Sequence, residues 1–311
     1  MKLDGLLTFV AIADAGSLSE AARQLRLSTS VVSERLSELE RFLDARLVQR
    51  TTRKLTLTPD GIAFYARARQ IVQQVAEATA EMSERRGELT GPLRIAGPVS
   101  FGNLHLGPAL YPFLARHPGI ELTLDLDDRF VDAAADGYDA VIRHGAVLDT
   151  RLVVKSLAIS RRLLVASPDY LARHGTPSNL PELERHRGIL FTNRGHADWR
   201  FQHGADNVVV RAEHCLRVNN GMVMRDAAIA GLGIALLPTF LVSDAVVSGQ
   251  LQVIEVGAEA EGAEVHIAYP RDRRVSAKVI ALIECLREAF GNPPVWDVAM
   301  HAHLRGPKHA G

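Results

Sequence analysis

The 311-residue sequence predicts a multidomain chain of α + α/β class. Up to residue 88, apolar residues recur at helical spacing, interrupted by one short basic segment. From residue 89, short apolar runs alternate with helical stretches, which is typical of parallel sheets covered by helices. The second part is large for one sheet and long enough for two α/β subdomains.

The first 58 residues predict three short helices followed by a small hairpin. The first helix ends at Gly16, the second begins at the capping box Ser17-Leu18-Ser19-Glu20, and the third is capped by Ser28. Residues 47–50 and 54–58 predict two short strands around a basic turn. A helix, a helix, a turn, a helix and a basic hairpin make up a winged helix-turn-helix.

The charge of the chain is balanced, with 36 Lys+Arg and 36 Asp+Glu, but basic residues gather around the predicted hairpin. No acid occurs between Asp44 and Asp60. Such a patch can neutralise several phosphates even in a neutral chain, although by itself it also fits a solvated surface. The patch consists of Arg46, Arg50, Arg53 and Lys54.

A longer helix begins at Pro59-Asp60-Gly61, and we expect it to dimerise the chain. Its apolar residues follow a heptad pattern, and the charged residues 84–88 end it as a hinge. The alternative is a helix that packs on its own domain; the polar residues on the remaining faces favour self-association. The heptad seam consists of Phe64, Ala68, Ile71, Val75, Ala78 and Met82.

The remaining residues alternate between predicted strands and predicted helices. The strands are expected at 93–96, 122–126, 140–142, 163–166, 233–237 and 265–268, and the helices at 103–116, 168–174, 220–230, 239–247 and 275–290. The final residues, 301–311, show no apolar period and predict a loose tail.

Cysteine content and hydropathy exclude several classes of protein. Cys215 and Cys285 cannot build a disulfide framework or a zinc site, which indicates a reducing, cytoplasmic compartment. Asp4 and the absence of an uninterrupted apolar core near the N-terminus argue against a secretory signal. The longest uncharged run, 227–243, is too short and too interrupted to span a bilayer. We expect a soluble protein with no cofactor, no metal site and no membrane contact.

Segments that carry a family resemblance are spread over nearly the whole chain except the tail: Phe9–Ala22, Leu25, Leu27–Ser33, Leu39-Glu40, Leu47–Arg53, Leu57–Gly61, Leu93–Pro98, Asp139–Arg143 and Gly231–Pro238. On these residues the chain resembles the LysR-type transcriptional regulators. The sequence at residues 97–102 and 127–132 resembles the branch of the family that controls aromatic-acid and aldehyde metabolism and efflux.

The resemblance implies a winged helix-turn-helix DNA-binding domain, a linker helix and an effector domain with two Rossmann-like lobes, like a periplasmic binding protein. It also implies a bacterial regulator that binds double-stranded operator DNA as a homodimer or a homotetramer and is nucleoid-associated when bound. A small organic acid as effector and RNA polymerase are the further expected partners. The expected boundaries are 1–58, 59–88 and 89–300, with lobes at 89–160 plus 269–300 and at 161–268, crossovers near 159–162 and 266–269, and a tail at 301–311.

The start of the third helix and the hairpin are the expected DNA contacts. Ser28, Thr29 and Ser30 can hold a phosphate at a helix N-terminus, with simple capping as the alternative. The resemblance places Ser33 at the major groove, together with Glu34 where most of the family carries a basic residue. A carboxylate repels phosphate but accepts from cytosine or adenine, so we expect a changed sequence preference; pairing with Arg35 is the alternative. The expected DNA-binding set is Ser28, Thr29, Ser30, Ser33, Glu34, Arg35, Arg50, Arg53 and Lys54, with Arg53 placed in the minor groove by the resemblance.

A second site is expected at the carboxyl ends of strands, where small anions bind. Ser100 lies between a predicted strand and a helix, so its hydroxyl and the following amides can hold a carboxylate. Arg129, Arg143 and His144 can add positive charge or hydrogen bonds, and Asn219-Asn220-Gly221 opens a helix in the second lobe that faces the cleft by analogy. Aromatic residues are either ligand contacts or plain core. The expected effector-binding set is Ser100, Phe101, Arg129, Arg143, His144, Trp199 and Asn219.

Two other classes of function were weighed against a regulator. A solute-binding transport protein would share two lobes but would need a signal sequence and would have no use for residues 1–58. An enzyme would need a catalytic constellation. Ser100 lacks the first glycine of a nucleophile elbow, no His–Asp pattern accompanies it, and we find no Gly-rich phosphate loop. We therefore expect no enzymatic activity.

Overall fold

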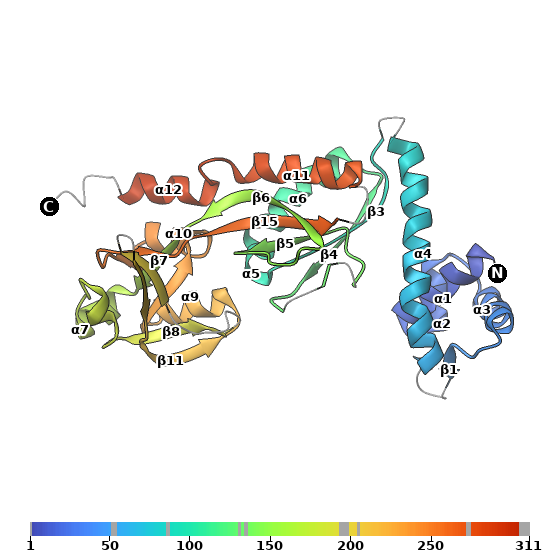
Figure 1. Cartoon of the computed structure of the whole chain (residues 1–311), viewed down its shortest axis with the longest axis horizontal. Helices are drawn as coiled ribbons and strands as arrows, with labels where there is room; N and C mark the ends of the chain where they lie inside the picture. The colour runs from blue at the N-terminus through green and yellow to red at the C-terminus, as the bar shows by residue number, and fades with distance from the viewer. Residues whose placement is uncertain are drawn as a thin grey trace. The chain divides into compact units, whose positions relative to one another are not determined.

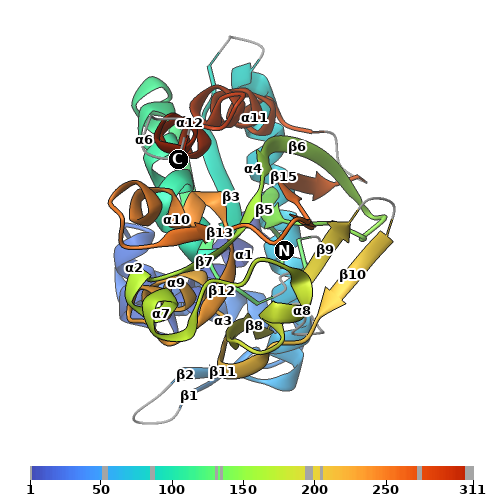
Figure 2. The same ribbon diagram turned by 90° about the vertical axis from the view of Figure 1, so that its left-hand side faces the viewer.

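A computed structural model of the chain describes residues 2–50, 55–84, 88–129, 132–133, 136–192, 199–203, 206–271 and 275–304. The chain divides into two units, Met1–Gly91 and Pro92–Gly311. The first unit is mainly helical, and the second combines sheets with covering helices (Figures 1 and 2). This confirms the predicted α + α/β class.

The first unit contains the predicted winged helix-turn-helix. Gly16, with φ 61°, ends α1 in the left-handed region that favours glycine. Ser17 Oγ accepts from the Glu20 amide at 3.5 Å, and Ser28 Oγ accepts from the Val31 amide at 3.3 Å, so both predicted caps are confirmed. The elements are α1 (Leu3–Ala15), α2 (Leu18–Gln24), α3 (Thr29–Leu43), β1 (Val48–Arg50), β2 (Leu55–Leu57) and α4 (Pro59–Glu84).

A buried carboxylate joins helix α3 to the start of the hairpin. Glu40 is 9% exposed, and its Oε1 accepts from the amides of Leu47 at 2.8 Å and Val48 at 3.2 Å. Arg46 Nη1 lies 3.6 Å from the other carboxylate oxygen. Without Glu40, two amides in a buried turn would lose their acceptor, so this side chain fixes where the hairpin leaves the helix.

The heptad seam of α4 divides into two parts. Ala68 is fully buried in the core of its own unit, and Phe64 packs partly buried against that core, 5.7 Å from the ring of Phe9. Because α4 packs on α1 at this end, Ala68 belongs to the core of its own unit and is not available for the predicted seam between two chains. The rest of the seam is exposed: Ile71 (37%), Val75 (38%), Ala78 and Met82 (49%).

The second unit is built on two five-stranded sheets and a smaller three-stranded one. The first sheet has the order β4 (Ile120–Leu126), β3 (Gly91–Gly97), β5 (Ala140–His144), β15 (Ala263–Pro270), β6 (Leu152–Ser160). The second has the order β11 (Glu213–Val218), β8 (Arg187–Phe191), β12 (Ile234–Pro238), β7 (Arg162–Ala166), β13 (Gln252–Ile254). The third has the order β10 (Asp206–Val210), β9 (Trp199–His203), β14 (Glu259–Ala260).

The sheets are mixed and not parallel as predicted. Strands β3 and β5 pair in parallel, as do β8 with β11 and with β12. Strand β15 runs antiparallel to β5 and β6, and β7 runs antiparallel to β12 and β13. The reason is that the chain leaves the first sheet through β6 and returns through β15, so these two strands point in opposite directions. The predicted boundary between residues 268 and 269 falls inside β15.

Helices cover both large sheets, and the helix predicted at 103–116 begins earlier, at Val99. It runs through α5 (Val99–Phe101), a π-helical turn (Gly102–Leu106) and α6 (Gly107–Arg116). In the π turn the Gly107 amide donates to the Gly102 carbonyl, next to Pro108, which has no amide to donate. The other helices are α7 (Pro168–His174), α8 (Leu180–Leu183), α9 (Gly221–Ile229), α10 (Thr239–Val247), α11 (Ala277–Phe290) and α12 (Val295–Leu304).

Helix α12 corrects the prediction of a loose tail from residue 301. Its Trp296 and Met300 are 4% and 1% exposed and four residues apart, so they share the face of α12 that packs on α10. The helix therefore continues to Leu304, and residues 305–311 lie outside the described part of the chain. Among the described residues, no single helix is long and apolar enough to cross a membrane, and α1 with α2, which pass that test only jointly, are bent by 120°.

The Glu40 contacts predict a loss of stability in the first unit. We expect Glu40→Ala to lower the free energy of opening around α3 and β1 by about 1–3 kcal/mol, because two buried amides lose their acceptor. Hydrogen exchange of the amides in residues 29–50 measures this. Glu38→Ala is the matched control: its ion pair with Lys2 is at the surface, and we expect a change below about 0.5 kcal/mol. Equal effects of the two substitutions would contradict the assignment.

Candidate functional site

Helix α3 presents part of the expected DNA-binding set to solvent. Thr29, Ser30 and Glu34 are exposed and Ser33 is half-buried. The hydroxyl of Ser28 caps the helix and lies 2.8 Å from Ser30 Oγ, so capping accounts for Ser28. Arg53 and Lys54, together with the side chain of Arg50, lie outside the described part of the chain.

Of the two charged residues after Ser33, Arg35 is paired within its own unit and Glu34 is exposed to solvent. Arg35 forms an ion pair with Asp4 of α1 at 3.1 Å, so in this structure it joins two helices of its own unit. The alternative pairing of Glu34 with Arg35 is therefore not formed. Among the described residues no ion pair holds Glu34, and its carboxylate is left at the solvent face of the helix.

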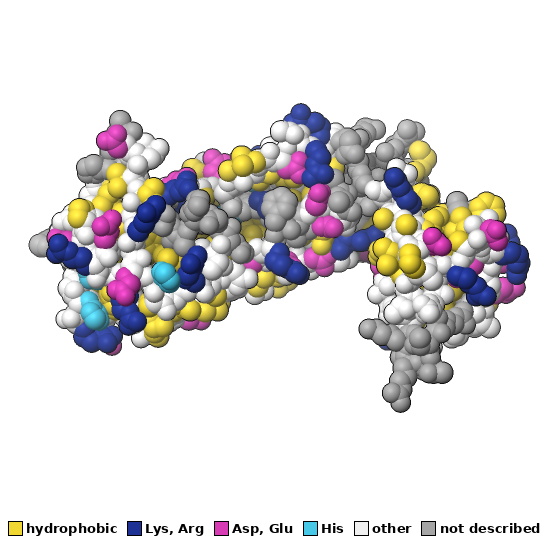
Figure 3. All heavy atoms as spheres, turned by 60° about the horizontal axis from the view of Figure 1, so that its bottom comes forward, with side chains coloured by type: hydrophobic (Ala, Val, Ile, Leu, Met, Phe, Trp, Pro, Cys, Tyr) yellow, Lys and Arg dark blue, Asp and Glu magenta, His cyan; other side chains and the backbone are white. Residues whose placement is uncertain are grey.

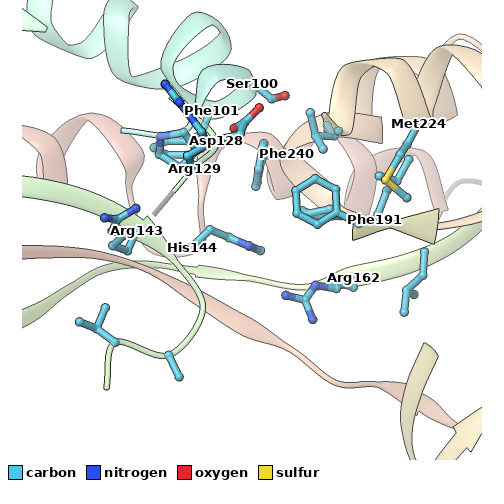
Figure 4. A pocket seen from close by; sticks show the side chains of 18 of the residues that line it. Ser100, Phe101, Asp128, Arg129, Arg143, His144, Arg162, Phe191, Met224 and Phe240 are labelled. Carbon is cyan, nitrogen blue, oxygen red and sulfur yellow. The ribbon is translucent and has the colours of Figure 1, made fainter. Parts of the chain in front are cut away.

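The second unit contains a cavity of about 700 Å³ between its two large sheets. Its lining comes from α5 and from the segments after β4 and β5 on one side, and from β7, β8, α9, β12 and α10 on the other (Figure 4). Six of the seven residues in the expected effector set line it: Ser100, Phe101, Arg129, Arg143, His144 and Trp199.

Ser100 is 5% exposed, and its buried hydroxyl oxygen has no hydrogen-bond partner among the residues that the structure describes. It faces Gly221 of the opposite side, where an added Cβ would lie 3.6 Å from Ser100 Oγ. Beside it, Asp128 Oδ1 accepts from the Val99 amide at 3.0 Å, and the Gly102 amide donates to the Pro98 carbonyl. A carboxylate of the protein itself thus already lies at the helix start where a ligand carboxylate was expected.

Asp128 also links the two sides of the cavity through a hydrogen bond to Asn220. This contact is made by Asn220 and not by the predicted residue Asn219. Asn220 Nδ2 donates to Asp128 Oδ2 at 3.2 Å, while Asn220 Oδ1 caps α9 by accepting from the Met222 amide at 3.0 Å. Asn219 is exposed and does not line the cavity. The capping rule could have selected Asn220, because the cap residue directly precedes the first helical residue, Gly221.

Much of the charge around the cavity is paired within the protein. Arg129 donates to Asp127 at 2.7 Å, which lowers the pKa of the Asp127 carboxyl, so Arg129 does not supply an uncompensated charge as expected. Hydrogen bonds from Arg151 lower the pKa of Asp149 to about 2. Figure 3 likewise shows Lys and Arg side chains interspersed with Asp and Glu over the visible face. Arg143 is different: burial lowers the pKa of its guanidinium.

The apolar part of the cavity wall includes two residues expected as ligand contacts. Trp199 is 4% exposed and belongs to the core of the second large sheet while it also lines the cavity. Phe101 packs edge-on against Phe240 at 5.1 Å and against Trp296 at 5.8 Å. His144 Nε2 lies 2.8 Å from Ser160 Oγ. Core packing and cavity lining therefore coincide in these aromatic side chains.

Arg162 is the cavity residue that the sequence analysis missed. It is the first residue of β7 and 7% exposed. Its Nη1 donates to the Glu261 carbonyl at 3.0 Å, whereas its Nη2 is buried without a hydrogen-bond partner. The sequence signal, an arginine directly before an apolar strand, was weak because strands often begin with a charged residue at the sheet edge.

The fold and the cavity define a class of protein: a winged helix-turn-helix unit followed by a two-lobed unit that encloses a small-molecule cavity is a ligand-responsive DNA-binding regulator. Residues 3–62 match the family described as "Bacterial regulatory helix-turn-helix protein, lysR family", and residues 86–291 match "LysR substrate binding domain". The chain belongs to the LysR family of transcriptional regulators. It is a regulator and not an enzyme.

Relatives match along nearly their full length. The chain is 33% identical to the HTH-type transcriptional repressor PA14_22550 of Pseudomonas aeruginosa, covering 94% of this chain and 93% of that one. The solved structure of CrgA, a LysR-type transcriptional regulator from Neisseria meningitidis, has 29% identity and a TM-score of 0.59, covering 93% and 98%. The full-length structure of the Vibrio cholerae virulence activator AphB has 25% identity and a TM-score of 0.59, covering 92% and 98%.

A histidine at the junction of the two lobes predicts a dependence of stability on pH. His105 Nε2 lies 3.1 Å from the Phe240 carbonyl, and burial lowers the pKa of its imidazole. The folded state therefore favours neutral His105, so this contribution to stability is present above the unfolded pKa of about 6.5 and is lost as pH falls below it.

We expect His105→Gln, which keeps a donor for Phe240, to show a smaller decrease in melting temperature between pH 7.5 and pH 5.0 than the parent protein. Burial also lowers the pKa of His186, so part of the dependence remains. Differential scanning calorimetry measures both proteins. The exposed His214 gives the control His214→Gln, and an unchanged slope in both variants would argue against His105 as the source.

Proposed function

We propose that this regulator binds a two-fold symmetric operator and that a small organic acid in the cavity of the second unit controls its binding. The observation that carries the proposal is the cavity itself: about 700 Å³ with two buried, unpartnered polar groups on mostly apolar walls. Its volume lies within the range of pockets that hold small ligands. We infer a cytoplasmic regulator that is nucleoid-associated when bound.

We propose that the DNA is read by α3 and the hairpin. Thr29 and Ser30 are exposed at the helix start, where amide and hydroxyl groups favour a phosphate, and Ser33 follows one turn later. Glu34 then changes the base preference relative to regulators with a basic residue at this position. Arg50 and Lys54 supply phosphate contacts of the hairpin, and Arg53 enters the minor groove.

We propose that the exposed half of the α4 seam joins two chains. Ile71, Val75, Ala78 and Met82 are exposed apolar residues on one helix, and covering them requires a second apolar surface. A symmetric dimer, or a dimer of dimers, matches an operator with two-fold symmetry. At a promoter where the protein activates transcription, it would also contact RNA polymerase.

Substituting Glu34 tests the DNA-reading surface. We expect Glu34→Gln to tighten binding to DNA of unrelated sequence, because a charge that repels phosphate is removed, and to change discrimination at one base position by about 1–3 kcal/mol. Fluorescence anisotropy at fixed salt, with fragments from the upstream intergenic region and single-base variants, measures both effects. The control is Glu38→Gln, on the same helix and paired with Lys2. Indistinguishable behaviour of the two variants would place Glu34 away from DNA.

Reciprocity tests the effector. If an acid bound in the cavity changes operator affinity by some factor, the operator must change the affinity of that acid by the same factor. Calorimetry with aromatic and aliphatic acids, in the presence and absence of operator DNA, measures both factors. We expect at least one acid to bind, and we expect the factor by which it changes operator affinity to equal the factor by which the operator changes the affinity of that acid. Failure of every acid to bind would reject this class of effector.

A further inference from the structure

Two buried polar groups without a hydrogen-bond partner among the described residues lie at separate places in the cavity wall, which also includes the polar residues Asp127, Arg129, Arg143, His144 and Asp149. Ser100 and Asp128 lie together on one side of Phe240, and Arg162 lies on the other side (Figure 4). Both unpartnered buried groups of the cavity lining, Ser100 Oγ and Arg162 Nη2, belong to these two places. The intervening lining is mostly apolar and includes Leu190, Phe191, Trp199, Met224, Leu236 and Phe240.

The Ser100 end does not suit an anion. The carboxylate of Asp128 already accepts from the Val99 amide and from Asn220 at this end. A second carboxylate beside Ser100 would meet like charge in a largely buried place. A neutral hydroxyl fits better, because it can accept from Ser100 Oγ and donate to the Asp128 carboxylate.

The Arg162 end requires an anion. Arg162 is 7% exposed, and the hydrogen bond that its guanidinium donates is to the neutral carbonyl of Glu261. Among the described residues no carboxylate pairs with Arg162, in contrast to Arg129, which is paired with Asp127. A buried positive charge without a counterion is unfavourable, so an anionic group that reaches Nη2 gains both an ion pair and a charge-assisted hydrogen bond.

Building on the proposed effector site, we propose that the effector is a monoanion with a fixed orientation. Its anionic group binds Arg162, its apolar body crosses Phe240 and Met224, and a hydroxyl at its far end binds Ser100 and Asp128. Arg162 and Ser100 are then the two residues that determine specificity. Gly221 lies opposite Ser100, with an added Cβ only 3.6 Å from Ser100 Oγ, so a ligand hydroxyl bound to Ser100 also lies close to the start of α9.

Matched ligands and variants of the full-length protein test this orientation by calorimetry. The ligands are 4-hydroxybenzoate, benzoate and methyl 4-hydroxybenzoate, with 6-hydroxyhexanoate, hexanoate and methyl 6-hydroxyhexanoate as the aliphatic set. Arg162→Gln keeps an amide donor for the Glu261 carbonyl but removes the charge. Arg129→Gln is the control, because Arg129 lines the same cavity but is paired with Asp127 and its side chain is 84% exposed.

In one set or both, we expect the parent protein and Arg129→Gln to bind the hydroxy acid at least about tenfold more tightly than its methyl ester, the size of a charge-assisted hydrogen bond. Arg162→Gln should lose this preference and still bind the ester, which a general loss of structure would not produce. Ser100→Ala should keep the preference for acid over ester but lose the preference for hydroxylated over plain acid.

Three results would overturn the proposal in distinguishable ways. Binding of no acid to the parent protein rejects the acid effector itself, and with it this orientation. An unchanged preference for acid over ester in Arg162→Gln rejects Arg162 alone. Loss of the preference for acid over ester in Ser100→Ala would show that the anionic group binds at the Ser100 end, which is the opposite orientation. If Arg162→Gln does not fold, Arg162→Lys keeps the charge and should retain the preference for the acid; its loss in a folded Lys variant counts against the proposal.

Discussion

The carboxylate of Asp128 is the contact on which the geometry of the cavity depends. One of its oxygens accepts from the Val99 amide at the start of α5, and the other accepts from Asn220 at the start of α9. The start of α5, on the side of the first large sheet, and the start of α9, on the side of the second, thus both contact the Asp128 carboxylate. The dipoles of both helices favour a negative charge at this place. This places Ser100 against Gly221 and leaves the serine hydroxyl without a partner. Any ligand that competes for these groups changes how the two lobes meet.

Behind this polar contact, an aromatic cluster holds the lobes together. Trp296 of α12 packs against Phe101 and His105 on the side of the first sheet and against Phe240 on the side of the second. Ser243 Oγ also donates to the Trp296 carbonyl at 2.6 Å. The C-terminal helix therefore bridges both lobes, and its apolar contacts set the resting arrangement that a ligand has to change.

The arginines show why a charge count along the chain could not define the ligand site. Arg129 and Arg151 are paired with acids two residues before them, and Arg94 pairs with Asp125. These pairs compensate the charge of several arginines, including Arg129 of the cavity lining. Burial distinguishes Arg162, which lines the cavity and is 7% exposed, so a ligand there meets a charge that water screens little.

The sequence alone determined the features that depend on neighbours along the chain. The caps at Ser17 and Ser28, the helix end at Gly16 and the order of elements in the winged helix-turn-helix all follow from local backbone hydrogen bonding. Ser100 was also found locally, from its place between a strand and a helix. Only the tertiary structure decided that Ala68 is core, that Arg129 is paired, that Asn220 contacts Asp128 of the cavity wall, and that no carboxylate among the described residues pairs with Arg162. The physical reason is that burial and partner choice depend on residues far apart in the sequence, such as Asp128 and Asn220, which become neighbours only when both sheets have formed.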